Sequence, residues 1–170
     1  IIMKKITLLF LAMLIVPTIA MAQYPGKGTI DINAGIGLGH SFSGSGGIPI
    51  NVAVDYGYND DVSIGGYLGY LGNSEDFGTG TWKYSNLVIG ARGTYHKQFV
   101  DNVDTYGGLI LGYNVASAEW DGPGANSASV GGIIYQGFVG GRYHFTEKLG
   151  AYGELGFGIA LLQFGVTYRM

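Results

Sequence analysis

The sequence predicts an all-β protein, an eight-stranded antiparallel up-and-down transmembrane β-barrel, from three observations. Charged residues make up 12% of the 170-residue chain, about half of the roughly 25% usual in soluble domains. After residue 22, apolar side chains alternate with polar ones or glycine, which is the period of a β-strand. The same region has no apolar run long enough for a membrane helix. Because only helices and closed barrels satisfy every backbone group in lipid, this combination favours a barrel.

The N-terminal segment has the pattern of a secretory signal peptide. Lys4 and Lys5 precede an apolar run over residues 6–16, and Ala20-Met21-Ala22 supplies the small residues of a cleavage site. We therefore expect residues 1–22 to be a signal peptide, which leaves residues 23–170, or 170 − 22 = 148 residues, as one barrel domain. The chain contains no cysteine, so no disulfide framework is expected.

The first three predicted strands cover residues 30–39, 48–58 and 62–70. In each of them the even-numbered side chains are mostly large and apolar, whereas the odd-numbered ones are mostly polar, small or glycine. One apolar face and one polar face per strand is the alternation of a barrel that meets lipid outside and side chains inside.

The next three predicted strands cover residues 84–96, 106–115 and 133–145. Here the odd-numbered side chains form the apolar face, and glycine, asparagine, arginine and histidine are frequent on the other face. Ile110 is an exception, because it lies on the otherwise polar face of its strand.

The last two predicted strands cover residues 149–158 and 162–170. The final strand alternates cleanly between large apolar residues and polar residues or glycine. Its apolar residues are Leu162, Phe164, Val166, Tyr168 and Met170. We expect this strand to close the barrel by pairing with the first one.

The predicted connections alternate in length, as they do in outer-membrane barrels with short turns on one side and long loops on the other. In chain order they are residues 40–47, 59–61, 72–82, 101–104, 117–129, 146–148 and 158–160. Aromatic residues of the apolar face gather near both ends of the strands, where amphipathic rings favour the two membrane interfaces. One predicted belt holds Tyr56, Tyr58, Tyr95, Tyr143, Phe145 and Tyr168, and the other holds Tyr70, Tyr113, Tyr135, Phe157 and Phe164.

A soluble, lipocalin-like carrier is the alternative eight-stranded barrel, with its apolar face inside. Its outer face would need many charged residues for solubility. The polar face here is mostly glycine, asparagine and tyrosine, which favours the membrane barrel. Residues 23–170 hold 7 basic and 12 acidic residues and no basic run, so nucleic acid is not an expected partner.

The chain after residue 27 resembles the small bacterial outer-membrane barrels of the OmpA/OmpX-like superfamily, often called the outer membrane protein β-barrel domain. The resemblance is most specific in the last hairpin, Glu154-Leu155-Gly156-Phe157-Gly158 followed by residues 164–170. It implies a location in the bacterial cell outer membrane, with lipid, lipopolysaccharide and the barrel-assembly machinery as partners. Met170 stands where that family's closing strand usually ends in phenylalanine.

Charged residues on the polar face predict a network inside the barrel, because an eight-stranded barrel is just wide enough for side chains to fill and buried charges must pair. The network residues are Asp31, Asp55, Arg92, Asp104, Arg142, Glu154 and Arg169. We expect Glu154 to meet Arg142, one strand away, or Arg92 across the lumen, and Arg169 to meet Asp31. The network is interpreted as a structural plug, with a gated polar pathway as the alternative.

The sequence predicts a structural or surface-interaction role, with loop aromatics as candidates for contacts. These candidates are Phe42, Phe77, Trp82 and Trp120, and the surface ligand is unknown. A narrow channel for ions or small solutes is the second hypothesis. A lipid-modifying enzyme is the third, and it rests only on His40 beside Ser41 and Ser43. No catalytic residue, cofactor or metal site is expected: His96 and His144 have no third ligand nearby in sequence, and the acidic turns lack the calcium-loop pattern.

Overall fold

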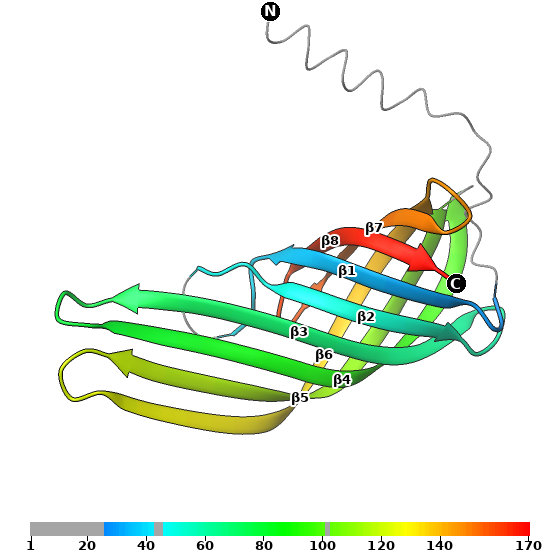
Figure 1. Ribbon diagram of the computed structural model, residues 1–170. Coiled ribbons are helices and arrows are strands. Elements are labelled where there is room, and N and C mark those ends of the chain that lie inside the picture. The colour runs from blue at the N-terminus through cyan, green and yellow to red at the C-terminus, as the bar shows by residue number, and fades with distance from the viewer. Residues whose placement is uncertain (1–25, 43–45, 101–102) are drawn as a thin grey trace, which may run out of the picture.

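The computed structural model describes residues 26–42, 46–100 and 103–170, and these form a closed, antiparallel barrel of eight strands (Figure 1). In chain order the strands are β1 (Ile30–Leu38), β2 (Ile50–Gly57), β3 (Val62–Asp76), β4 (Thr81–Val100), β5 (Val103–Asp121), β6 (Asn126–His144), β7 (Leu149–Phe157) and β8 (Leu162–Arg169). Each strand pairs with its sequence neighbours, and β1 pairs with β8. The predicted fold class and the closing role of the last strand are confirmed. The predicted signal peptide, residues 1–22, lies outside the described residues.

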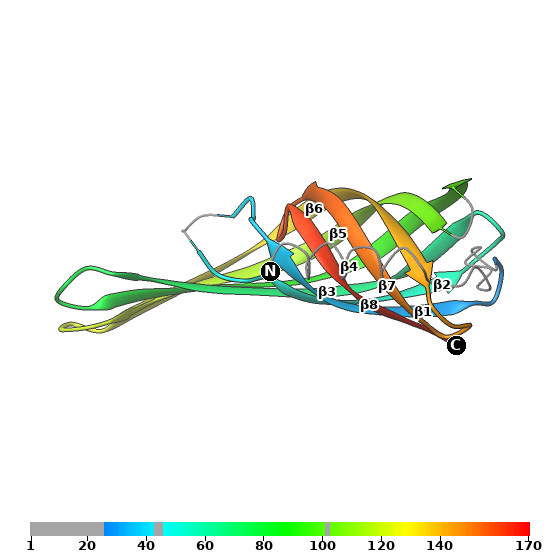
Figure 2. The same ribbon diagram turned by 90° about the horizontal axis from the view of Figure 1, so that it is seen from above.

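The strands fall into two length classes. β1, β2, β7 and β8 have eight or nine residues, close to the roughly 9–11 residues of a tilted membrane-spanning strand. β3 has 15 residues, β4 has 20, and β5 and β6 have 19 each. The hairpins β3–β4 and β5–β6 therefore extend far beyond the rest of the barrel, as the green and yellow ribbons in Figures 1 and 2 show.

Two of the predicted loops are wrong, because most of their residues continue the strands. β3 runs to Asp76 and β4 starts at Thr81, and the second hairpin turns only between Asp121 and Asn126. Polar residues, glycine and proline are frequent in these segments, as they are in loops, although Trp82, Tyr84 and Trp120 still alternate with polar residues. The hydrogen-bond ladder does not need a continuous apolar face. It continues through cross-strand pairs such as Trp82 opposite Trp120, whose rings lie 5.4 Å apart.

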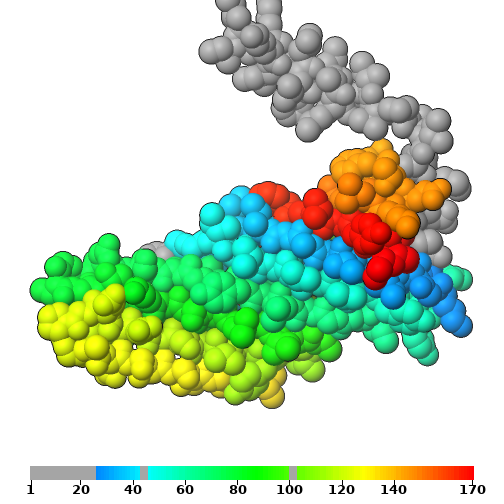
Figure 3. Space-filling view, in the orientation of Figure 1, coloured from blue at the N-terminus to red at the C-terminus, as the bar shows by residue number. Residues whose placement is uncertain are grey.

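The extensions form a four-stranded sheet, here called the protruding sheet, which comprises residues 71–76, 81–86, 116–121 and 126–130. The space-filling view shows it projecting from the barrel (Figure 3). β2 pairs with β3 only as far as Tyr70, and β7 pairs with β6 only from Gly137 onward. In the part of the chain that the structure describes, both outer edges of the protruding sheet therefore lack a strand partner.

Side chains alternate between the lumen and the outside along every strand. On β4, for example, Arg92, Thr94 and His96 are buried, whereas the intervening Gly93 and Tyr95 are exposed. The outward row is apolar on all strands, and it includes Ile50, Ile64, Ile89, Leu111, Val139, Leu155 and Val166. All aromatic residues of the two predicted belts lie on this outward side, exposed except for the half-buried Tyr143. No helix among the described residues is long and apolar enough to cross a membrane.

The half of the lumen next to the protruding sheet is filled by apolar side chains, which the sequence did not predict. Its buried residues include Tyr67, Leu71, Val88, Ile110, Phe138 and Ile159. Ile159 comes from the turn between β7 and β8, which folds inward and is tied to the β1–β2 connection by hydrogen bonds between Ser41 and Gly158. The turn thus closes the mouth of the barrel where the protruding sheet begins.

Two adjacent glycines on β3, Gly65 and Gly66, test which side of the strand faces the lumen. A Cβ at Gly65, on the lumen side of β3, would collide with the Val54 carbonyl oxygen and the Asp55 backbone, whereas one at Gly66 would meet nothing within 4 Å. We expect Gly65→Ala to lower the free energy of unfolding by about 1–3 kcal/mol through overpacking. Gly66→Ala, the matched control, should leave it close to wild type. Urea unfolding in detergent micelles measures both, and equal losses for the two variants would contradict the assigned parity.

Candidate functional site

The seven predicted network residues all face the lumen, and each comes from a strand whose alternation points it inward. The structure places Asp31 on β1, Asp55 on β2, Arg92 on β4, Asp104 on β5, Arg142 on β6, Glu154 on β7 and Arg169 on β8. All except Arg169 are at least nine-tenths buried. They form one connected set of ion pairs in the half of the lumen away from the protruding sheet.

Arg92 pairs with two carboxylates of this network, Glu154 and Asp55. Its Nη1 and Nη2 donate to the two carboxylate oxygens of Glu154 at 3.3 and 2.7 Å, and its Nε lies 3.0 Å from Asp55 Oδ1. The Tyr106 hydroxyl donates to Glu154 at 2.9 Å. The guanidinium also lies 4.0 Å from the centre of the Phe138 ring, a cation–π contact that screens it from the apolar layer above. Of the two expected partners of Glu154, Arg92 is the one in place.

Arg142 joins three carboxylates from three different strands. Its Nη1 lies 2.6 Å from Asp31 Oδ2 and 3.7 Å from Asp104 Oδ2, and its Nη2 lies 3.2 Å from Asp55 Oδ2. The Tyr106 ring covers the guanidinium at 4.9 Å. Because Asp55 also contacts Arg92, the two arginines share this carboxylate, and the network links β1, β2, β4, β5, β6 and β7.

Arg169 connects the network to the seam where the barrel closes. Asp31 and Arg169 are directly opposite each other in the β1–β8 register. Arg169 Nε donates to Asp31 Oδ1 at 2.8 Å and its Nη2 donates to Oδ2 at 3.2 Å. The expected contact between these residues is therefore present, in a bidentate geometry that adds directional strength to the seam.

A second buried chain, which the sequence did not single out, joins Ser63, His96 and Asp104. His96 Nδ1 lies 2.9 Å from Asp104 Oδ1, and its Nε2 lies 2.9 Å from the Ser63 hydroxyl. This is the order of groups in a nucleophilic triad, but the Ser63 side chain is fully buried, so a substrate has no route to it. The chain links β3, β4 and β5. Parity alone places all three residues inside, but only the folded register brings them together.

His40 and Ser41, the residues on which the enzyme hypothesis rests, each hydrogen-bond to another group. The His40 ring lies 3.1 Å from the Phe42 carbonyl oxygen and 2.9 Å from that of Gly46. The Ser41 hydroxyl instead accepts a hydrogen bond from the Gly158 amide. Ser43 lies outside the described residues. Within the described part of the chain, no group of three or more His, Cys, Asp or Glu side chains is placed to hold a metal ion.

The aromatic interaction candidates occupy different environments. Phe77 is exposed in the tight connection between β3 and β4. Trp82 and Trp120 lie on strands, not in loops, and their rings meet in a tilted arrangement, at 48° to each other, on the inner face of the protruding sheet. Phe42 turns inward and packs against the buried apolar cluster. Only Phe77 is therefore presented as a free loop side chain.

The protruding sheet is acidic. Its residues include Glu75, Asp76, Glu119 and Asp121 against a single base, Lys83, for a net charge of 1 − 4 = −3. Lys83 donates to Asp121 at 2.7 Å. This hydrogen bond raises the pKa of Lys83 and lowers the pKa of Asp121. Both side chains are exposed, so the pair is screened by solvent and contributes little to stability.

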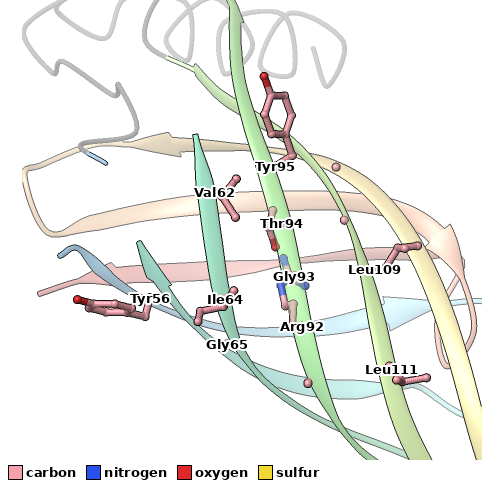
Figure 4. Close-up of a pocket in the computed structure, with 13 residues that line it drawn as sticks. Tyr56, Val62, Ile64, Gly65, Arg92, Gly93, Thr94, Tyr95, Leu109 and Leu111 are labelled. Atoms are coloured by element: carbon pink, nitrogen blue, oxygen red, sulfur yellow. The ribbon is translucent and has the colours of Figure 1, made fainter. Parts of the chain in front are cut away.

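An open apolar groove of about 960 Å³ lies on the outside of the barrel, across β3, β4 and β5 (Figure 4). Ile64, Tyr95, Leu109 and Leu111 line it, and glycines at positions such as Gly93 leave it hollow. Its lining is almost entirely apolar. This face has the chemistry of a surface that contacts hydrocarbon chains.

Comparison with solved structures shows the fold. The attachment invasion locus protein Ail of Yersinia pestis, in complex with the heparin analogue sucrose octasulfate, has 14% sequence identity and a TM-score of 0.58, over 85% of this chain and 99% of that one. The N-terminal β-barrel domain of Pseudomonas aeruginosa OprF has 15% identity and a TM-score of 0.57, with the same coverage. The sequence matches no family model and no curated protein. The resemblance to OmpA/OmpX-like outer-membrane barrels is thus confirmed for the fold.

Removing Glu154 tests whether the lumen network stabilises the barrel. In Glu154→Ala, Arg92 keeps only Asp55 as a partner, and a buried ion pair that loses one member typically costs about 3–5 kcal/mol. We expect a correspondingly lower urea midpoint for the protein folded in detergent micelles. Lys83→Met, which breaks an exposed pair, is the control and should unfold like wild type. A wild-type midpoint for Glu154→Ala would show that the network does not hold the barrel together.

Proposed function

We propose that residues 23–170 form an outer-membrane barrel that is secreted with residues 1–22 as its signal peptide. The observation that supports this most strongly is the outward face, which is apolar on all eight strands and continuous around the closed barrel. Soluble monomers rarely expose apolar patches larger than a few hundred Å². The eight- or nine-residue strands β1, β2, β7 and β8 fit the thickness of a bilayer.

The length of the connections gives the orientation. Outer-membrane barrels place short turns in the periplasm and long segments outside. Residues 58–61 and 145–148 would then face the periplasm, and the protruding sheet would face the outside. Lipid and lipopolysaccharide would surround the apolar face, including the groove of Figure 4. The barrel-assembly machinery would receive the β8 strand.

We infer that the lumen is a structural plug. Its inner half is occupied by paired charges, and its outer half by the apolar cluster and the inward turn at Ile159. A channel for ions or small solutes would require both layers to move. Ser63 is buried, and His40 and Ser41 hydrogen-bond to other groups, so neither site supports a lipid-modifying enzyme. The role that the geometry supports best is therefore interaction at the cell surface.

The protruding sheet is the proposed interaction surface. It has two edges without strand partners among the described residues, and such edges can pair with another chain. It also presents Phe77 at one tip and the Trp82–Trp120 pair on its inner face. Ail binds a sulfated sugar analogue, but the net charge of −3 here opposes polyanions. We propose an uncharged or basic partner.

The absence of cysteine makes the orientation directly testable. Thr79→Cys lies at the exposed tip between β3 and β4, and Lys148→Cys lies in the exposed turn between β6 and β7. On intact cells a membrane-impermeant maleimide should label only Thr79→Cys, and permeabilising the outer membrane should expose Lys148→Cys. The reverse pattern would invert the proposed topology, and labelling of both in a soluble fraction would exclude the membrane location.

Shortening the two hairpins tests the interaction role. Leu71 pairs with Asn86 and Ala116 with Val130, so an Asn-Gly turn can replace residues 72–85 or 117–129 without changing the register. We expect the doubly shortened barrel to fold, as shown by heat-modifiable gel migration. Autoaggregation and adherence to cultured epithelial cells should fall to the level of cells that lack the protein. Undiminished adherence of correctly folded, surface-exposed variant would reject this role.

A further inference from the structure

A hollow of about 370 Å³ lies at the base of the protruding sheet, on the side that continues the lumen wall. Inward-facing residues of β4, β5 and β6 line it, and Phe42 from the β1–β2 connection closes one side. Its volume is within the range of small-molecule sites. It lies at the level where β2 no longer pairs with β3, so it opens where the barrel meets the outside.

The floor of the hollow is a pair of buried amides. Asn114 Nδ2 donates to Asn86 Oδ1 at 2.9 Å, and both side chains are more than nine-tenths buried. Asn114 Oδ1 has no hydrogen-bond partner in the protein. A buried acceptor without a partner is costly. This oxygen is covered in the structure, with an accessible area below 1 Å², so a ligand hydroxyl or amide N–H would satisfy it once the Asn114 amide rotates towards the hollow.

The walls combine aromatic rings with very small side chains. Tyr84 lines the hollow, and it stacks on Trp82 with ring centres 6.2 Å apart. On the other strands Ala116, Ala118 and Ala128 leave the space open. Every residue that lines the hollow is uncharged. The site therefore offers a flat apolar surface and neutral hydrogen-bonding groups.

We propose that this hollow binds a neutral carbohydrate. A sugar ring has an apolar C–H face that packs on an aromatic side chain, and hydroxyl groups at its edge that donate to and accept from amides. An anionic saccharide would gain no cationic partner here, and the acidic sheet around the hollow would repel it. The proposal rests on the surface-interaction role, since it names the ligand class that the protruding sheet recognises.

The two tryptophans make binding directly observable. They are the only two in the chain, and Trp82 and Trp120 both lie on the sheet that forms the hollow. We would titrate the purified full chain, folded in lauryldimethylamine oxide micelles because that detergent carries no sugar. The probes are the methyl glycosides of glucose, galactose, mannose and N-acetylglucosamine. Sucrose octasulfate and choline chloride are the anionic and cationic comparisons.

The expected result is a saturable change in tryptophan fluorescence with at least one neutral glycoside. Ala118→Phe fills the hollow and Asn114→Leu removes its acceptor, and each should raise Kd at least about tenfold, as for other sites built to hydrogen-bond a hydroxyl. Glu119→Gln, the neighbouring position on the opposite face of β5, is the matched control and should bind like wild type. Heat-modifiable migration confirms that each variant is folded.

Three outcomes would overturn the proposal: no saturable response to any neutral glycoside, stronger binding of octasulfate or choline, or unchanged affinity in folded Ala118→Phe. Because binding is measured on purified protein, such a failure leaves the topology and the adherence of whole cells unaffected. Conversely, glycoside binding with no loss of adherence on hairpin shortening would reject only the interaction role.

Discussion

The rest of the structure depends on the pairing of charges inside a closed barrel. Once eight strands close on themselves, any ionised group on the inner face is removed from water, and an unpaired one would cost several kcal/mol. Four carboxylates and three guanidiniums meet this constraint by sharing: Asp55 contacts both Arg92 and Arg142, and Asp31 contacts both Arg142 and Arg169. Because these residues come from seven different strands, the pairs are satisfied together only when the whole cylinder has its native register.

The same constraint explains the distribution of glycine around the network. Gly140 lies opposite Glu154 in the β6–β7 register, and a side chain there would meet the Glu154 Cγ. Gly65 lies opposite both Asp55 and Arg92. These glycines give Asp55, Arg92 and Glu154 room on one side in the narrow lumen. Other network residues lie directly opposite a partner of the other charge: Asp104 is opposite Arg142, and Asp31 is opposite Arg169 at the seam.

Sequence alone predicted the strand count, the lumen side of each strand and the closing role of β8, because an apolar outer surface and paired charges inside impose a strict alternation. The sequence did not determine whether Glu154 pairs with Arg142 or with Arg92. Arg142 is on the adjacent strand, but the register places it opposite Tyr152, two positions away, and Arg92 reaches across instead. The inward turn at Ile159 was also unpredictable, since its burial depends on how β7 and β8 end at the mouth. The extensions of β3 to β6 were missed because polar residues, glycine and proline predominate there and outweigh the short alternation at Trp82, Tyr84 and Trp120.

The contrast between the barrel and the protruding sheet explains how the fold can be shared with barrels of 14 or 15% identity while the surface differs. Within the barrel, alternation and charge pairing decide only whether each position is apolar, small or charged. Many different sequences meet these requirements. Beyond the barrel, the sheet is held by the ladder of backbone hydrogen bonds and by a few cross-strand contacts such as Trp82–Trp120, so most of its side chains are free to vary. In this chain they produce an acidic sheet with aromatic rings over a neutral amide floor. The recognition that we propose therefore depends on the side chains of the protruding sheet, and its chemistry follows from the residues of this chain, not from the fold.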